Sequence, residues 1–192
     1  MKRVCEAVVV GASAGGVEAM LTVLSRLPSD FTLPLIIVLH IPEGRRSELS
    51  TVFERRLRRP VREVDDKAPV ESGVIHVAPP SYHLSIEQDR SFSLSVEPRV
   101  HHSRPSIDVL FESAADAYGQ ALAGVLMTGA SHDGASGLLA IHRAGGLTVV
   151  QDPREARVAT MPEAALRLFR PDHILTLQGI SELFADLDAG TC

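Results

Sequence analysis

Three polar residues, Ser13, His40 and Asp133, have the chemical types of a serine hydrolase triad, and each one follows an apolar segment. A serine hydroxyl can attack a carbonyl carbon, a histidine can take its proton near neutral pH, and an aspartate can orient the imidazole. Ser13 lies in GASAGG (11–16), which fits the G-x-S-x-G pattern of a nucleophile on a sharp strand-to-helix turn. These residue types therefore indicate acyl-transfer chemistry if the fold brings them together.

Each of the three residues also has an ordinary interpretation. A glycine-rich turn before a helix binds phosphate as readily as it presents a nucleophile, and some such turns only allow close packing. A histidine that ends an apolar strand is commonly a residue at the rim of a sheet, and Asp133 is well placed to cap the helix that follows it. From the turn at 11–16 alone, all three interpretations stay open.

The elements that would position these residues alternate between strands and helices. Apolar runs predict strands buried on both faces, as in a parallel sheet, at 6–10, 33–39, 121–127 and 147–151. Helical spacing of apolar residues predicts helices at about 15–27, 47–57, 106–118, 135–144, 162–169 and 180–187. Shorter strand-like pieces lie at 61–64, 74–78, 83–87, 92–97 and 174–177, and those at 83–87 and 92–97 predict a hairpin.

The predicted fold class is therefore α/β: a doubly wound, mostly parallel sheet with a small antiparallel hairpin, in a single domain over residues 1–192. In such sheets ligands bind beyond the carboxyl ends of the strands. Ser13, His40 and Asp133 all follow strands at that edge. The α/β-hydrolase order of serine, acid and histidine would instead need His173, which precedes its strand and belongs at the opposite edge, so that assignment is rejected.

Composition limits the other function classes. The net charge of −5, from 19 basic and 24 acidic residues, argues against a protein that binds nucleic acid through bulk attraction to phosphate. The longest apolar run, 33–39, is far shorter than the roughly 20 residues that cross a bilayer, and the first residues lack a signal-peptide pattern. Cys5 and Cys192 suggest no disulfide framework, and His101-His102 lacks companions at ligand spacing. We expect a cytoplasmic protein with no metal and no cofactor.

Six sequence blocks carry a resemblance to a known family. In chain order they are VVVGASAGGVEA (8–19), the strand ending in His40-Ile41-Pro42, VIHVAPPSYHLSI (74–86), HSRPSIDVLFESAA (102–115), GVLMTGASHDGASGL (124–138) and VVQDPREARVATMPEAAL (149–166). Together they resemble the catalytic domain of the CheB-type chemotaxis protein-glutamate methylesterases. Because the blocks extend over nearly the whole chain in family order, the resemblance is specific.

The resemblance implies an enzyme that hydrolyses γ-methyl esters of chemoreceptor glutamates and that in many members also deamidates receptor glutamines. Its nucleophile, histidine and aspartate fall on Ser13, His40 and Asp133, in agreement with the strand-edge argument. We expect the backbone at Ala14 and Gly15 to hold the oxyanion. The chain departs from the family at Ala14, where Thr is common, and at Ala130-Ser131-His132, where Met is frequent; both places border the family's active site.

Two other functions are compatible with the sequence. One is a phosphate- or nucleotide-binding domain that uses the turn from Gly11 to Gly16, although Ser13 replaces the second glycine of G-x-G-x-x-G. The other is a catalytically idle interaction module, which an intact triad disfavours. The expected partner is a methyl-accepting chemoreceptor or a similar signalling protein.

Two further expectations concern the surface and the regulation of the protein. A basic stretch from Arg45 to Arg62 is either a solvated helix face or a docking surface for an acidic partner. Members of the family that the chain resembles typically carry an N-terminal receiver domain, whereas here the first predicted strand begins about five residues after Met1. The chain is therefore either an excised fragment or a protein that is not controlled by a receiver of its own. We therefore expect activity without a phosphodonor, which an assay with and without acetyl phosphate would test.

Overall fold

Strand β1 (Ala7–Ala12) lies at the centre of the sheet, and all six of its residues are buried. Its side chains alternate between two hydrophobic cores, with Ala7 and Val9 in one and Val8 and Val10 in the other. This computed structural model describes residues 4–40 and 49–190. A continuous apolar run in β1 follows directly from burial on both faces of a parallel sheet.

Seven parallel strands form the sheet in the order β3-β4-β2-β1-β7-β8-β9. Besides β1 they are β2 (Leu35–Leu39), β3 (Val61–Glu63), β4 (Ile75–Val77), β7 (Leu122–Leu126), β8 (Leu147–Gln151) and β9 (His173–Leu175). The chain fills one side of β1 first and the other side afterwards, so that β1 and β7 mark the point where the winding direction changes. Such switch points are where open α/β sheets bind ligands.

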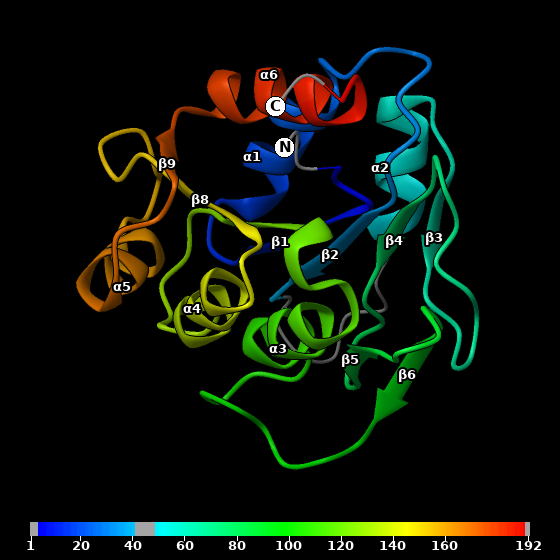
Figure 1. The fold of residues 1–192 in the computed structure, drawn as a ribbon, viewed down its shortest axis with the longest axis horizontal. Coiled ribbons are helices and arrows are strands. Elements are labelled where there is room, and N and C mark those ends of the chain that lie inside the picture. Colours follow the sequence, from blue (N-terminus) through cyan, green and yellow to red (C-terminus); the bar gives the residue numbers. More distant parts are fainter. Residues whose placement is uncertain (1–3, 41–48, 191–192) are drawn as a thin grey trace.

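Helices cover both faces of the sheet (Figure 1). One face carries α1 (Gly16–Leu24), α2 (Leu49–Leu57) and α6 (Leu177–Asp188). The other carries α3 (Ile107–Tyr118), α4 (Ala135–Arg143) and α5 (Thr160–Leu168), and a short 3₁₀ helix (Gly119–Ala121) leads from α3 into β7. The doubly wound α/β prediction is confirmed.

The antiparallel pair β5 (His83–Ile86) and β6 (Phe92–Ser95) confirms the predicted hairpin. Its apolar residues, Leu84, Ile86 and Phe92, are buried in the core that contains α3. The Ser113 hydroxyl of α3 also accepts a hydrogen bond from the Ile86 amide at 3.1 Å. The hairpin therefore packs directly against the helix that leads away from the candidate site.

Several boundaries differ from the sequence-based expectations. The short pieces β3 and β4 join the parallel sheet rather than the hairpin. Helix α6 begins before residue 180, because Thr176 caps it by accepting a hydrogen bond from the Gly179 amide at 3.2 Å. In the described part of the chain, no helix is long and apolar enough to span a bilayer.

Candidate active site

Ser13 and His40 lie side by side at the carboxyl ends of β1 and β2. The parallel register pairs Ala12 with Leu39, so the next residue of each strand is one of the two candidates. The His40 amide donates to the Ala12 carbonyl at 3.1 Å, and the Ser13 amide donates to the Thr128 carbonyl beyond β7 at 2.9 Å. Backbone pairing across three adjacent strands thus brings the serine and the histidine to one edge.

Asp133 reaches this edge from the loop between β7 and α4 and contacts His40 directly. Its Oδ2 atom lies 2.8 Å from His40 Nε2, and the two side chains are 0% and 12% exposed. An aspartate in this position orients the imidazole and stabilises its protonated form. Two of the three predicted residues are therefore joined by a direct hydrogen bond.

The start of helix α3 surrounds the Asp133 carboxylate with hydrogen-bond donors. Oδ1 accepts from the Ser106 hydroxyl at 2.8 Å and from the Asp108 amide at 3.0 Å, and Oδ2 accepts from the Ile107 amide at 2.7 Å. Burial raises the pKa of this carboxyl, but the hydrogen bonds from His40, Asp108, Ile107 and Ser106 outweigh it and hold the pKa below its ordinary value. Asp133 is therefore an ionised acceptor at neutral pH.

These contacts correct the capping interpretation of Asp133. The residue that caps its own helix, α4, is Gly134, which has φ of 94° and no side chain to offer. The Asp133 side chain instead serves the N-terminus of α3, whose own N-cap is Ser106. Asp133 thus does satisfy helix amides, but those of a helix that precedes it in the sequence.

His83 on the hairpin supports this arrangement from behind. Its Nδ1 atom accepts a hydrogen bond from the Ser106 amide at 3.2 Å, so the ring proton is on Nε2, which donates to the Pro98 carbonyl at 3.1 Å. Both His83 and Ser106 are buried. A chain of contacts therefore runs from the hairpin through Ser106 and Asp133 to His40.

The imidazole of His40 faces Asp133 with one ring nitrogen and the Ser103 hydroxyl with the other. Because the ionised Asp133 accepts from Nε2, the unprotonated nitrogen is Nδ1, the reverse of the orientation in the chymotrypsin template. The hydroxyl of Ser103 lies 3.4 Å from Nδ1. Among the described residues, the Ser13 hydroxyl forms no hydrogen bond and the side chain is only partly buried.

The loop around Ser13 has several features of an oxyanion site. Gly15 has φ of 80° and precedes α1, so the N-terminal amides of this helix face the same edge. Within the described residues, the amides of Ala14, Gly15 and Ala130 donate no hydrogen bond to the protein, and the side chains of Ala14 and Ala130 are exposed. These donors are available to a developing negative charge.

The chain matches the family model described as CheB methylesterase over residues 8–184. It belongs to the CheB methylesterase family. The catalytic domain of Thermotoga maritima CheB methylesterase has the same fold, with a TM-score of 0.90 and 27% identity over 95% of this chain and 98% of that domain. The predicted family, fold class and ester hydrolase class are thereby confirmed.

Two relatives illustrate the range of CheB chain lengths. A Leptospira interrogans protein, provisionally named a protein-glutamate methylesterase/protein-glutamine glutaminase, is 48% identical over 95% of both chains. A Hahella chejuensis protein-glutamate methylesterase/protein-glutamine glutaminase is 39% identical over 91% of this chain, which spans only 49% of that protein. The first relative therefore matches this chain in extent, and the second has as much sequence again outside the matched region.

Sequence reasoning missed several residues that support the CheB site. Thr128 is buried; its hydroxyl donates to the Ala14 carbonyl at 2.8 Å and accepts from the Val158 amide at 3.0 Å, so it ties the serine loop to the loop before α5. Ser103 and Asp108 lie in the block 102–115, which carried part of the resemblance, but nothing in their spacing indicated which groups they contact. The N-cap of α3 is Ser106, whose hydroxyl accepts a hydrogen bond from the Val109 amide.

Two histidines without a predicted role, His101 and His132, lie together near the start of α4. His101 and His132 line a pocket of about 260 Å³ with Arg167, and His101 Nε2 lies 3.3 Å from Asp108 Oδ2. No group of three or more His, Cys, Asp or Glu side chains that could hold a metal occurs among residues 4–40 and 49–190.

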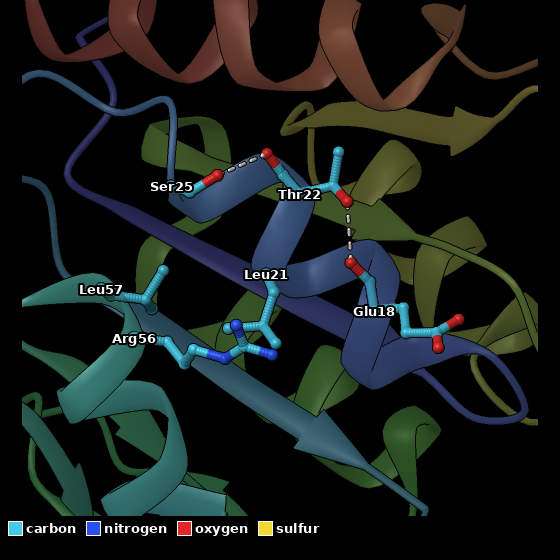
Figure 2. Close-up of a pocket in the computed structure, with 6 residues that line it drawn as sticks. All are labelled: Glu18, Leu21, Thr22, Ser25, Arg56 and Leu57. Atoms are coloured by element: carbon cyan, nitrogen blue, oxygen red, sulfur yellow. Dashed lines mark hydrogen bonds between the residues drawn. The ribbon is translucent and has the colours of Figure 1, made fainter.

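The arginines of the basic stretch differ in whether they have a partner in the protein. Arg45 and Arg46 lie outside the described residues. Arg59 donates to the carbonyls of Leu27 and Pro28, and Arg62 pairs with Glu71 at 2.5 Å. By contrast, the exposed guanidinium groups of Arg55, Arg56 and Arg58 have no acidic partner in the described part of the chain. Figure 2 shows Arg56 reaching toward Leu21 of α1 across a pocket of about 370 Å³ between α1 and α2.

Proposed function

We propose that this protein hydrolyses γ-methyl esters of glutamate residues in a chemoreceptor or a similar signalling protein, using Ser13, His40 and Asp133. The activity follows the names of its relatives, protein-glutamate methylesterase/protein-glutamine glutaminase. The single observation that carries the catalytic assignment is the Asp133–His40 hydrogen bond at the strand edge where Ser13 follows the neighbouring strand. Deamidation of glutamine would use the same groups.

The proposed reaction has two stages. Ser13 Oγ attacks the ester carbonyl while His40 Nδ1 takes its proton, and collapse of the tetrahedral intermediate breaks the bond to the methoxy oxygen, which leaves as methanol with that proton. A water molecule, deprotonated by His40, then attacks the glutamyl ester on Ser13. The second collapse releases the glutamate carboxylate and returns the proton to Ser13 Oγ.

Charge on the substrate oxygen is stabilised by the backbone in this proposal. The unused amides of Ala14 and Gly15 are the donors, and the N-terminal dipole of α1 adds to their effect. Loss of the Thr hydroxyl that the family commonly has at position 14 is compatible with this role, because backbone amides do not depend on the side chain. The side chain of Ala130 is exposed and apolar, and its unused amide is a further donor.

Ser103 is the rival nucleophile, since its hydroxyl is the one within 3.4 Å of the base. Its surroundings argue against it. Ser103 lies in a tight turn in which it and Val100 exchange backbone hydrogen bonds, and the amides at the start of nearby α3 already donate to Asp133. The Ser13 loop, by contrast, directly precedes the N-terminus of α1, and its Ala14 and Gly15 amides donate to no acceptor among the described residues.

The deciding experiment measures methanol release from a methylated receptor by the wild type and by two matched serine variants. Ser13→Ala is expected to remove activity, whereas Ser103→Ala keeps it within about tenfold, the effect of one lost hydrogen bond. Full activity of Ser13→Ala together with loss in Ser103→Ala would move the nucleophile to Ser103. No methanol release by the wild type would reject the proposed substrate.

A further inference from the structure

The N-terminal amides of α3 and α4 are hydrogen-bonded in a reciprocal way, each set to a carboxylate from the other segment. Asp133, from the loop before α4, accepts hydrogen bonds from the Ile107 and Asp108 amides of α3. Asp108, in the first turn of α3, accepts in return from the amides of Gly134 and Gly137 of α4, at 2.9 and 2.6 Å, both through Oδ1. Each helix start is thus satisfied by a carboxylate from the other segment.

The loop that carries Asp133 leads directly into the N-terminus of α4. The first amides of a helix need acceptors, and the N-cap of α4 is a glycine without a side chain. A Cβ at Gly134 would lie 2.5 Å from Leu126 Cδ1, so the close approach of α4 to the sheet excludes a capping side chain there. Asp108 therefore supplies the acceptor that position 134 cannot.

We propose that Asp108 is a positioning residue for the hydrolytic site, whose carboxylate fixes the Gly134 amide and thereby the adjacent Asp133 against His40. The link is short, because Gly134 follows Asp133 directly in the chain. The inference rests on the proposed function only where turnover is the readout. The Asp133–His40 contact itself can be observed without any substrate.

Electrostatics show that Asp108 occupies this position at a cost. Burial, with a smaller effect from the nearby charge of Asp133, raises the pKa of Asp108 to about 6, although the Gly137 amide and His101 act in the opposite direction. Glu112, one turn along α3, is the remaining acidic group that faces it. A neutral residue would avoid the repulsion but, unless it offered an acceptor, would leave two amides unsatisfied.

The test compares Asp108→Ala with Asp108→Asn. Both substitutions remove the negative charge, but only asparagine keeps an oxygen acceptor at the position of Oδ1, so their difference isolates the hydrogen bonds. The first readout is the low-field proton NMR resonance of the His40 ring proton held against Asp133. The second is kcat and KM for methanol release. His101→Ala, which removes the exposed partner of Oδ2, is the matched control.

In Asp108→Ala we expect the low-field resonance to be lost and kcat to fall about 10- to 100-fold, as for a displaced catalytic group, with KM within about twofold. In Asp108→Asn and in the control, the resonance is expected to stay. Should Asp108→Ala not fold, Asp108→Ser, whose hydroxyl is too short to reach both amides, replaces it.

Three results would overturn the proposal. The first is an unchanged resonance in Asp108→Ala, and the second is an equal loss of kcat in Asp108→Ala and Asp108→Asn. The third is that Asp108→Ala and Asp108→Ser both fail to fold while Asp108→Asn folds. The last would assign Asp108 to global stability. If the wild type itself lacks esterase activity, the resonance still decides the positioning role, so failure of the proposed function is distinguishable.

Discussion

Asp133 and Ser13 stand at opposite ends of the proposed triad and are held in different ways. Asp133 is fully buried and engages His40 together with three donors from the start of α3. Ser13 is partly exposed, is fixed through its backbone, and has a hydroxyl without a hydrogen bond among the described residues. The acid end is thus preorganised by packed helices, whereas the serine end stays open to a large substrate such as a protein side chain.

The largest effect is expected when the serine end is broken. Ser13→Ala should reduce kcat by about 10⁶, His40→Ala should do nearly the same, and the double variant should lose little more, because members of a triad act as a unit. Rates of methanol release measure this. Multiplication of the two single losses would contradict the assignment, and unchanged melting temperatures serve as the control for folding.

Breaking the acid end should affect both turnover and stability. Asp133→Asn is expected to lower kcat about 10⁴-fold, since the amide cannot hold the imidazole as the carboxylate does. It should also lose about 1–3 kcal/mol of unfolding free energy, because an NH₂ group would face the donors of α3. Thermal melts and kinetics of one preparation measure both.

The pH dependence of that stability difference follows from the lowered pKa of Asp133. A depressed pKa contributes stability above the unfolded value of 3.8 that is lost as pH falls through the folded value. The gap between wild type and Asp133→Asn should therefore be constant near neutrality and narrow below about pH 4. A gap that persists at lower pH would contradict an ionised Asp133.

Asp108 should show the opposite sign and sharpen the comparison. Its pKa of about 6 in the folded protein exceeds the unfolded value of 3.8, so the ionised carboxylate destabilises the folded state, with the full effect above about pH 6. This destabilisation disappears as the pH falls toward 3.8. Asp108→Asn should therefore melt several degrees higher than the wild type at pH 8, with a gain of up to about 3 kcal/mol that vanishes near pH 4. A pH-independent difference would contradict this.

The smallest effect concerns the exposed arginines in the last turn of α2. The charges of Arg55 and Arg56 have no acidic partner in the described residues, so they are free to attract an acidic substrate protein. Arg55→Gln with Arg56→Gln should raise KM for a methylated receptor a few-fold at low ionic strength, with kcat unchanged. Arg143→Gln with Arg170→Gln, on the far side of the sheet, is the control; equal effects would argue against a local surface.

The sequence predicted the strand edge well and its supports poorly. Ser13 and His40 could be placed together because both directly follow apolar runs of a parallel sheet, whose carboxyl ends meet at one edge. The environment of Asp133 could not be predicted, because its donors lie about 25 residues earlier and are brought near only by the packing of α3 against α4. For the same reason the sequence could not predict the contact of His83 with Ser106, nor which ring nitrogen of His40 faces Asp133.

The reciprocal hydrogen bonds between the α3 and α4 segments also affect how this domain folds and opens. The amides of a first helical turn normally exchange with solvent hydrogen quickly, because nothing inside the helix accepts from them. Here those of Ile107, Asp108, Gly134 and Gly137 are tied to the opposite segment. They should therefore become protected together, as one cooperative unit, and only when the two helices dock. Formation of the Asp133 end of the site is then the same event as completion of this helix pair, so a partly folded chain would carry Ser13 without a working base.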